Sequence, residues 1–385
     1  MSLNMAKCGA MCILANGNPC MLAAPRGSPL ARIPFKACYK YLGVQFSGVG
    51  RRSAKALVEA RLTRANQLFH ALQPFLRLKD IPLRLRVNAV KSFLVPAVSY
   101  GLEFLPVRCQ TALHAIDNVI SQALHLIVGG STRAKCSALV LRREFKVAPL
   151  YARVLGSRTR MFAKFLDVPT LVGTIFDWPV MRHASWVQSF FRWLQVNATQ
   201  APTAEPKALG QWMQEKIWQE MAAKDNSASY RWYSGSMFQV SPKFLARPVW
   251  NKSLLCGVVA LVQMRCNTFM TASRLGHFVP QLSAQVCPCC HSPSSRETVE
   301  HVLLHCSKWI HDRDMYIVPV LRAFQRFGVQ LTSDKERCRA LLGGGQGHKF
   351  WLRRVRGSSL FTCVVGFLAA VIPVRARILF PSGSA

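Results

Sequence analysis

Residues 286–309 read VCPCCHSPSSRETVEHVLLHCSKW, a stretch with four cysteines and three histidines. Pairing Cys287 with Cys290 and His301 with Cys306 gives the spacing C-x2-C-x10-H-x4-C. A C-x2-C turn brings two thiolates together, and H-x4-C supplies two further ligands from about one helical turn, which suits tetrahedral zinc. We therefore predict a structural zinc site at Cys287, Cys290, His301 and Cys306. Four protein ligands leave no open position for a catalytic water.

Three alternatives stay open at this point. Cys289 can replace Cys290, although C-x-C leaves a short knuckle, and His305 can replace His301. The cysteines can also be buried thiols or part of a disulfide, with no metal.

The segment between the two ligand pairs predicts a helix. Ser295 or Thr298 can cap its start, and Glu297 and Glu300 would lie in its first turn, where acidic side chains favour the helix dipole. Such a helix would present His301, His305 and Cys306 close together.

Composition indicates a folded, basic protein of two or three domains. The chain has 385 residues, half of them hydrophobic, and its 50 Lys and Arg against 17 Asp and Glu give a net charge of +33. The hydrophobic content argues against disorder, and a charge of this size favours a polyanionic partner. Nucleic acid is the partner we expect; an anionic membrane surface is the alternative.

The 14 cysteines show no disulfide framework, which favours a reducing, intracellular compartment. No secretory signal is visible, and the choice between nucleus and cytoplasm stays open. The apolar run Ser358–Pro373 is interrupted by Gly366 and flanked by arginines, so we interpret it as a buried core helix and expect no membrane partner.

Hydrophobic periodicity predicts a mainly α-helical fold. Lys36–Phe46 is expected to form a strand pair with a bend at Gly43, after a short apolar strand within residues 3–14. The remaining elements are expected to be helices. The first helix starts at Arg51 and ends near Pro74, and the second starts at Asp80 and Pro82 and bends or ends at Pro96. The third spans 113–127 and the fourth starts near Pro149. Further helices are expected over 254–269, 314–327 and 349–372.

The expected organisation follows these elements. It comprises a small β remnant over residues 1–50, a helical bundle over 51–196, a linker over 197–210, a helical region with the zinc knuckle over 211–310, and C-terminal helices over 311–385.

Basic residues on the first two predicted helices form a candidate phosphate-binding wall. The members are Arg51, Arg52, Lys55, Arg84, Arg86 and Lys91. Any one of them can be an ordinary solvated charge, but together they predict contacts to a nucleic-acid backbone.

We assign no catalytic residue. The closest acidic pair, Asp312 and Asp314, fits a solvated helix start better than a two-metal site. Gly343–Gly345 with Lys349 lacks the ending of a phosphate-binding loop and is expected to be a turn.

Four segments resemble the carboxyl-terminal half of reverse transcriptases from non-LTR (LINE-type) retrotransposons. LNMAKCGAMCI (3–13) resembles the palm strand after the catalytic Tyr-x-Asp-Asp box, and KYLGVQF (40–46) resembles the primer-grip hairpin. IPLRLRVNAVKSFLVPAVSYGLEFL (81–105) is similar to a thumb helix, and the zinc knuckle resembles the region that follows the thumb. The resemblance covers roughly residues 2–165 and 250–306.

The resemblance implies an RNA-directed DNA polymerase ancestry, with RNA and DNA as template and primer. It implies that Lys7 lies near the outgoing pyrophosphate and that Tyr41, Leu42 and Gly43 grip the primer. The catalytic aspartates of the family have no counterpart here, so we expect no polymerisation by this chain alone; magnesium would serve only a full-length parent. The residues 1–50 would then be a palm remnant and residues 51–196 a thumb-like bundle.

The alternative function is a stand-alone zinc-dependent nucleic-acid-binding protein without polymerase activity. It predicts a closed surface, whereas a polymerase fragment predicts an exposed apolar sheet edge on residues 3–46. Protein partners are not predicted by any motif.

Overall fold

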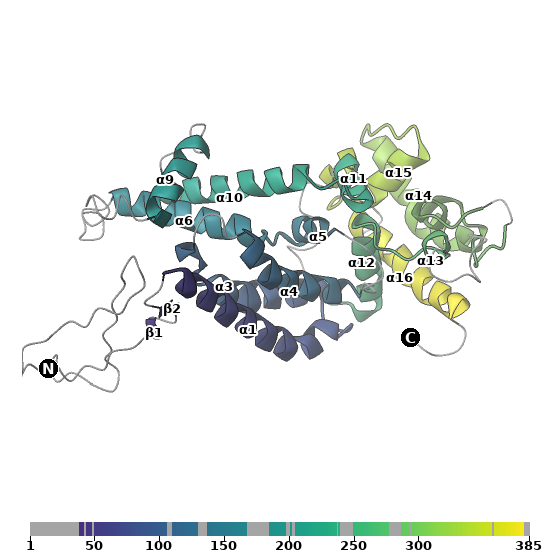
Figure 1. The fold of residues 1–385 in the computed structure, drawn as a ribbon. Coiled ribbons are helices and arrows are strands. Elements are labelled where there is room, and N and C mark those ends of the chain that lie inside the picture. The colour runs from purple at the N-terminus through teal and green to yellow at the C-terminus, as the bar shows by residue number, and fades with distance from the viewer. Residues whose placement is uncertain are drawn as a thin grey trace, which may run out of the picture. The chain divides into compact units, whose positions relative to one another are not determined.

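The computed structural model is mainly α-helical, as predicted, with very little β-structure (Figure 1). It describes residues 38–41, 44–47, 50–105, 110–129, 137–167, 185–197, 201, 205–236, 238, 249–276, 286–292, 295–355 and 358–380. The chain forms two compact units whose segments alternate along the sequence. The first unit comprises Met1–Ala71, Ser92–Ile120 and Ala148–Met221, and the second comprises Leu72–Lys91, Ser121–Val147 and Ala222–Ala385.

The first unit contains the predicted strand pair. β1 (Cys38–Tyr41) and β2 (Val44–Ser47) are antiparallel, and Tyr41 lies opposite Val44. This confirms the strand pair predicted within Lys36–Phe46. The strand predicted within residues 3–14 and the bend at Gly43 lie outside the described residues.

Helices make up the rest of the first unit, and three of them (α1, α4 and α10) continue into the second unit. They are α1 (Gly50–Arg77), α3 (Val95–Ser99), α4 (Gln110–Val128), α6 (Leu150–Asp167), α9 (Ser185–Asn197) and α10 (Pro206–Ala223). α1, α4 and α6 confirm three predicted helices. However, α1 does not end at Pro74 but continues to Arg77. The predicted linker over 197–210 is helical from Pro206 onward, because proline suits the first turn of a helix.

A π-turn explains why Pro96 does not end the second predicted helix. α2 (Leu83–Ala89) continues into a π-turn at Val90–Leu94 and then into α3, which contains Pro96. Proline lacks an N–H and its ring collides with the carbonyl one turn earlier, so the preceding turn must widen. The helical path ends beyond Tyr100, where Gly101 adopts φ 79°.

Two glycines allow α6 and α10 to lie side by side in the first unit (Figure 1). A Cβ atom at Gly156 would lie 2.6 Å from the carbonyl oxygen of Gly210, and one at Gly210 would lie 2.7 Å from that of Gly156. Backbone atoms cannot move aside as a flexible side chain can. Both positions therefore require glycine.

The core of the first unit includes a buried arginine. Arg158 on α6 donates through Nε to the carbonyl oxygen of Glu103 at 2.7 Å and through Nη2 to that of Leu105. Its guanidinium also lies over the ring of Phe190 from α9, 5.3 Å from the ring centroid. The side chain thus fixes the turn after α3 against α6 and α9.

The second unit is built from short helices around two long ones. Its elements, besides α2 and the ends of α1 and α4, are α5 (Ala138–Phe145), α11 (Ala228–Gly235), α12 (Lys252–Arg265), α13 (Ala272–Leu275), α14 (Ile310–Arg326), α15 (Asp334–Leu341), α16 (Leu360–Leu379) and the two-residue strands β3 (Arg354–Val355) and β4 (Ser358–Ser359). α12 and α14 confirm two predicted helices. α5, α11 and α15 were not predicted.

α16 is the central helix of the second unit and packs against α12 and α14. The contact with α12 is close: a Cβ atom at Gly257 would lie 2.2 Å from the carbonyl oxygen of Val365. Within the described ranges, α16 is the one helix long and apolar enough to cross a membrane. Its packing agrees with the core helix predicted over Ser358–Pro373. The helix predicted over 349–372 has the wrong bounds, because β3 and β4 precede α16, which begins at Leu360 and extends to Leu379.

A buried ion pair joins three segments of the second unit. Glu144 on α5 accepts hydrogen bonds from Arg265 on α12 at 2.7 and 3.0 Å and from the Tyr233 hydroxyl on α11 at 2.9 Å. Arg265 also donates to the carbonyl oxygen of Leu342, and its guanidinium stacks over Phe238. Burial, followed by the adjacent Glu144 carboxylate, raises the pKa of Tyr233 far above its ordinary value. The phenol therefore stays protonated and serves as a donor.

Glu144→Gln should destabilise the second unit strongly. The substitution leaves the Arg265 guanidinium buried without a carboxylate, and removing one partner of a buried pair costs about 3–5 kcal/mol. Urea unfolding, followed by tryptophan fluorescence, measures the change in the free energy of unfolding.

The matched control is Glu59→Gln. Glu59 forms an exposed pair with Lys55 on α1, at 3.8 Å, and an exposed i,i+4 pair contributes about 0.3–0.5 kcal/mol. Equal losses in the two variants would contradict the importance of the buried pair.

Candidate metal centre

A tight turn presents the first two ligands. The N–H of His291 donates to the carbonyl oxygen of Cys287 at 3.0 Å, and His291 itself adopts φ 52°. The N–H of Cys287 donates to the carbonyl oxygen of Ser295 at 3.1 Å, and Val286 forms a β-bridge with Arg296. The loop is thus closed by its own backbone, with Cys287 and Cys290 at either side of the turn.

A π-turn presents the other two ligands. His301–His305 forms a π-helix, and the N–H of Cys306 donates to the carbonyl oxygen of His301 at 2.8 Å, an i→i+5 bond. In a π-turn, residues five apart lie on nearly the same face, whereas in an α-helix they diverge. Thr298 begins this segment because its hydroxyl accepts from the N–H of His301 at 3.1 Å. Of the two predicted caps, Thr298 is therefore the one used.

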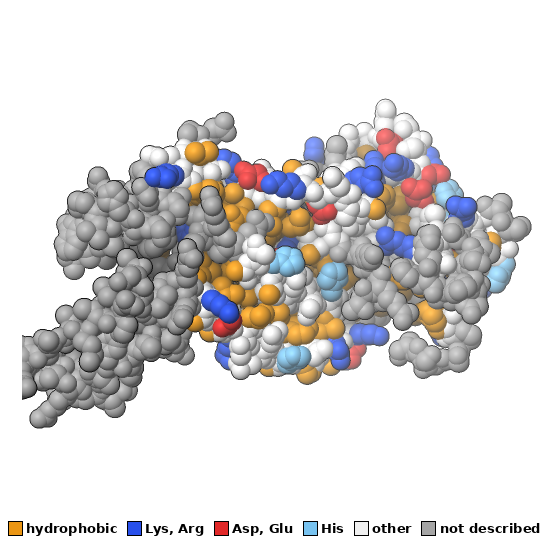
Figure 2. Space-filling view, viewed as in Figure 1, with side chains coloured by type: hydrophobic (Ala, Val, Ile, Leu, Met, Phe, Trp, Pro, Cys, Tyr) orange, Lys and Arg blue, Asp and Glu red, His pale blue; other side chains and the backbone are white. Residues whose placement is uncertain are grey.

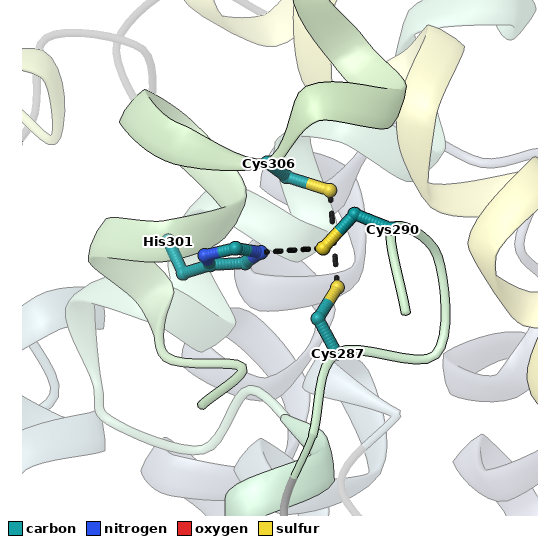
Figure 3. Close-up of side chains that lie close together, drawn as sticks. All are labelled: Cys287, Cys290, His301 and Cys306. Atoms are coloured by element: carbon teal, nitrogen blue, oxygen red, sulfur yellow. Dashed lines mark hydrogen bonds between the residues drawn. The ribbon is translucent and has the colours of Figure 1, made fainter. Parts of the chain in front are cut away.

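The four side chains point toward a common centre (Figure 3). The Sγ atoms of Cys287 and Cys306 are 3.8 Å apart, and Sγ of Cys290 lies 3.5 Å from Nε2 of His301. All four ligand atoms lie within 4.8 Å of one another. Tetrahedral zinc with Zn–S bonds of about 2.3 Å and a Zn–N bond of about 2.0 Å requires S···S edges of about 3.8 Å and S···N edges of about 3.5 Å. These two separations therefore match the edges of a zinc tetrahedron.

Comparisons with protein families, with curated proteins and with solved structures found no match to this chain. The assignment of the site therefore depends on its own geometry. Cys287, Cys290, His301 and Cys306 could hold a metal ion such as zinc, in agreement with the predicted ligand set.

The site's electrostatics favour a thiolate. Hydrogen bonds from the Cys289 thiol and then from the Cys306 thiol, together with backbone N–H groups, lower the pKa of Cys287 far below its ordinary range. Cys287 and Cys306 are buried, and Cys290 is partly exposed. The hydrogen bond to Cys287, followed by burial, raises the pKa of Cys306 far above its ordinary range. A metal ion bound by these four ligands would have no open position for a catalytic water.

The structure separates the predicted alternatives. Cys289 is buried near Cys287 and Glu297, but that group offers only three donors, and the Glu297 carboxylate already binds Arg375. His305 lies outside the cluster, because its Nε2 pairs with Asp334 at 3.0 Å on the surface. Cys287 and Cys306 are free cysteines and do not form a disulfide.

A buried ion pair that the sequence did not reveal anchors the metal loop. Glu297, predicted in a first helical turn, lies before it and is fully buried. Its carboxylate accepts from Nε and Nη2 of Arg375, both at 2.6 Å, and from the N–H of Ala272. Arg375 belongs to α16. The available signal was a pair of arginines, Arg375 and Arg377, near the end of an apolar helix in an acid-poor chain.

The structure describes the predicted phosphate-binding residues only in part, and those it describes belong to both units. Lys7 and Gly43 lie outside the described residues, and Tyr41 lies in β1. Arg51, Arg52 and Lys55 lie in α1, where only the Lys55 side chain is described, as exposed. Arg84 and Lys91 are partly exposed and belong to the second unit, not to the unit of Lys55.

Arg86 is a correction to the predicted wall, because only 3% of it is exposed. Its Nη1 donates to the carbonyl oxygens of Leu76 and Ile127, at 3.3 and 3.1 Å. These carbonyls belong to the last turns of α1 and α4, where a cation is favoured. The prediction grouped Arg86 with Arg84 because they are close in sequence. Residues two apart in a helix point to different sides, which agrees with Arg86 facing inward.

Cys290→Ser and Cys289→Ser form a matched pair that tests the ligand set. The first should lower zinc from about one per chain to well below one, since serine is a poor zinc ligand, while the second should retain it. Zinc content of dialysed protein, measured by mass spectrometry, checks this. Loss of zinc in Cys289→Ser but not in Cys290→Ser would show that Cys289 is the ligand and Cys290 is not.

Proposed function

We propose that this chain binds nucleic acid as the template–primer-holding part of a reverse transcriptase of the non-LTR retrotransposon type, with zinc as a structural cofactor. The observation that carries the proposal is the Cys287–Cys290–His301–Cys306 cluster in a chain of net charge +33. The spacing of the cluster is the most specific part of the resemblance. The charge supplies the affinity for a polyanion.

Two further features support the proposal. The KYLGVQF stretch forms the strands β1 and β2, which suits a hairpin that grips a primer. The segment 81–105 forms the helical path through α2, the π-turn and α3, which suits a thumb. Neither feature is specific alone. Together they support the proposal because the hairpin, the thumb-like helices and the cysteine cluster follow one another in the same order as in the reverse transcriptases that the sequence resembles.

The mechanism of binding is electrostatic. Lys55, Arg84 and Lys91 would contact phosphates, and each contact releases counterions. Bound zinc would hold the loop 287–306 in shape, while Glu297 and Arg375 attach that loop to α16. The proposal assigns no chemical step to these residues.

The alternative function is a stand-alone zinc-dependent nucleic-acid-binding protein. A template–primer grip should prefer an RNA–DNA hybrid with a recessed end over a blunt hybrid and over single strands of the same length. A binder without polymerase ancestry has no reason to recognise the recessed end. Fluorescence anisotropy with labelled oligonucleotides separates the two functions.

Affinity for nucleic acid should fall steeply with salt. A protein that contacts six to ten phosphates loses about 10³–10⁵ in affinity between about 50 and 200 mM salt. Anisotropy titrations at several salt concentrations measure the slope. Absence of binding at low salt by zinc-loaded protein would refute the proposal.

Neutralising the remaining predicted contacts should weaken binding more than neutralising other cations. The triple variant Lys55→Gln, Arg84→Gln, Lys91→Gln should reduce the salt slope by about one for each phosphate contact that is lost. The control Lys308→Gln, Arg322→Gln, Lys335→Gln removes the same charge from exposed positions of the second unit.

Equal slopes in the two triple variants would show that only net charge matters. Figure 2 gives the reason for choosing the control there: over α14 and α15, basic side chains lie among acidic ones, as in the pair Arg337–Asp334 at 3.0 Å. This surface carries several carboxylates, which repel phosphate, so its cations should contribute little to binding.

A further inference from the structure

A cavity of about 570 Å³ lies within the second unit, away from the cysteine cluster. The end of α1, the turn before α2, the end of α4, α12 and α16 surround it. This volume is typical of small-molecule sites. All of its lining residues belong to the second unit.

The cavity combines apolar walls with an excess of positive charge. Leu126, Val259 and Ile372 are among its apolar lining residues. Its charged lining residues are Arg77, Lys79, Arg86, Lys252 and Asp80. Four cations against one acid leave an excess of three positive charges. A monoester phosphate carries close to two negative charges at neutral pH, and a carboxylate carries only one, so phosphate matches the excess better.

Arg86 is the residue that distinguishes this cavity from an ordinary basic surface. Its side chain is buried, and its Nη1 is fixed by the carbonyl oxygens of Leu76 and Ile127. Its Nε and Nη2 have no hydrogen-bond partner among the described residues. These two nitrogens form one edge of the guanidinium, the edge that binds a phosphate or carboxylate with two parallel hydrogen bonds.

An unpartnered buried guanidinium is costly, because burial removes its hydration. Burial lowers the pKa of Arg86 below its ordinary value, and no carboxylate among the described residues hydrogen-bonds it. The carbonyls of two helix ends compensate part of the charge. Arg86 is among the residues that line the cavity. Both nitrogens of its unpartnered edge are covered by protein atoms, so a ligand that supplies the missing acceptor must displace the side chains that cover them.

We propose that this cavity binds a phosphate group carried on an apolar or aromatic body, with Arg86 as the central cation and Lys252 at the rim. The source can be a small phosphorylated molecule or a terminal phosphate of nucleic acid. The inference does not depend on the proposed function, since it uses none of the residues tested there and none of the metal ligands.

Calorimetric titration of the zinc-loaded full chain with octyl phosphate tests the site. Octyl phosphate should bind with one-to-one stoichiometry and more tightly than inorganic phosphate, which lacks the apolar part, or octanol, which lacks the charge. Failure of octyl phosphate to bind at millimolar concentration, or equal binding of octanol, would overturn the proposal.

Two variants locate the binding. Lys252→Glu should lower the affinity for octyl phosphate by about tenfold or more, because it reverses a rim charge. Position 252 is in the first turn of α12, where a glutamate is favourable, so the fold should survive. Lys335→Glu makes the same charge change in the first turn of α15, outside the cavity, and should leave the affinity unchanged.

Arg86→Lys tests the guanidinium edge directly, with an expected loss of about tenfold or more, since lysine keeps the charge but not the two parallel bonds. If this variant fails to fold, Lys252→Glu and its control decide. Equal affinities in Lys252→Glu and Lys335→Glu would overturn the location. Competition with a 5′-phosphorylated oligonucleotide identifies the source: displacement assigns the site to a nucleic-acid end, and no displacement assigns it to a small phosphorylated molecule.

Discussion

The close approach of the four ligand atoms is the constraint on which the conformation of residues 287–306 depends. The loop of residues 287–306 contains two turns, and a metal ion bound at the cluster would link them. The i→i+5 bond between His301 and Cys306 is the local device that makes H-x4-C compatible with a tetrahedron. The Glu297–Arg375 pair then joins the loop to the core of the second unit.

Buried arginines are the second principle of this structure. The chain is so poor in acids that carboxylates can neutralise only some of its buried cations. Arg265 and Arg375 have a glutamate, whereas Arg86 and Arg158 bind backbone carbonyls at the ends of helices and turns. Carbonyl oxygens satisfy hydrogen bonds but carry no full charge. The net positive charge of the chain is therefore not located only on its surface, because several arginine side chains are buried in the two cores.

The sequence predicted what depends on local patterns. Hydrophobic periodicity found α1, α4, α6, α12 and α14, and ligand spacing found the cysteine cluster. It did not find α5, α11 or α15, which are only eight residues long and too short for a clear period. It also missed α9 and α10, which are 13 and 18 residues long. The inward direction of Arg86 and the partner of Glu297 depend on residues far away in the chain. Such contacts have no local signature.

The position of α16 in the sequence has a consequence for synthesis of the protein. α16 contributes Arg375 to the contact with Glu297 and the surface on which α12 packs, yet it begins 54 residues after Cys306 (360 − 306). During translation, the side of α12 that packs on α16 stays exposed, and Glu297 lacks its Arg375 partner, until residues 360–379 emerge from the ribosome. During translation this interval is when chaperones would bind, and a frameshift late in the reading frame would leave the same face permanently uncovered.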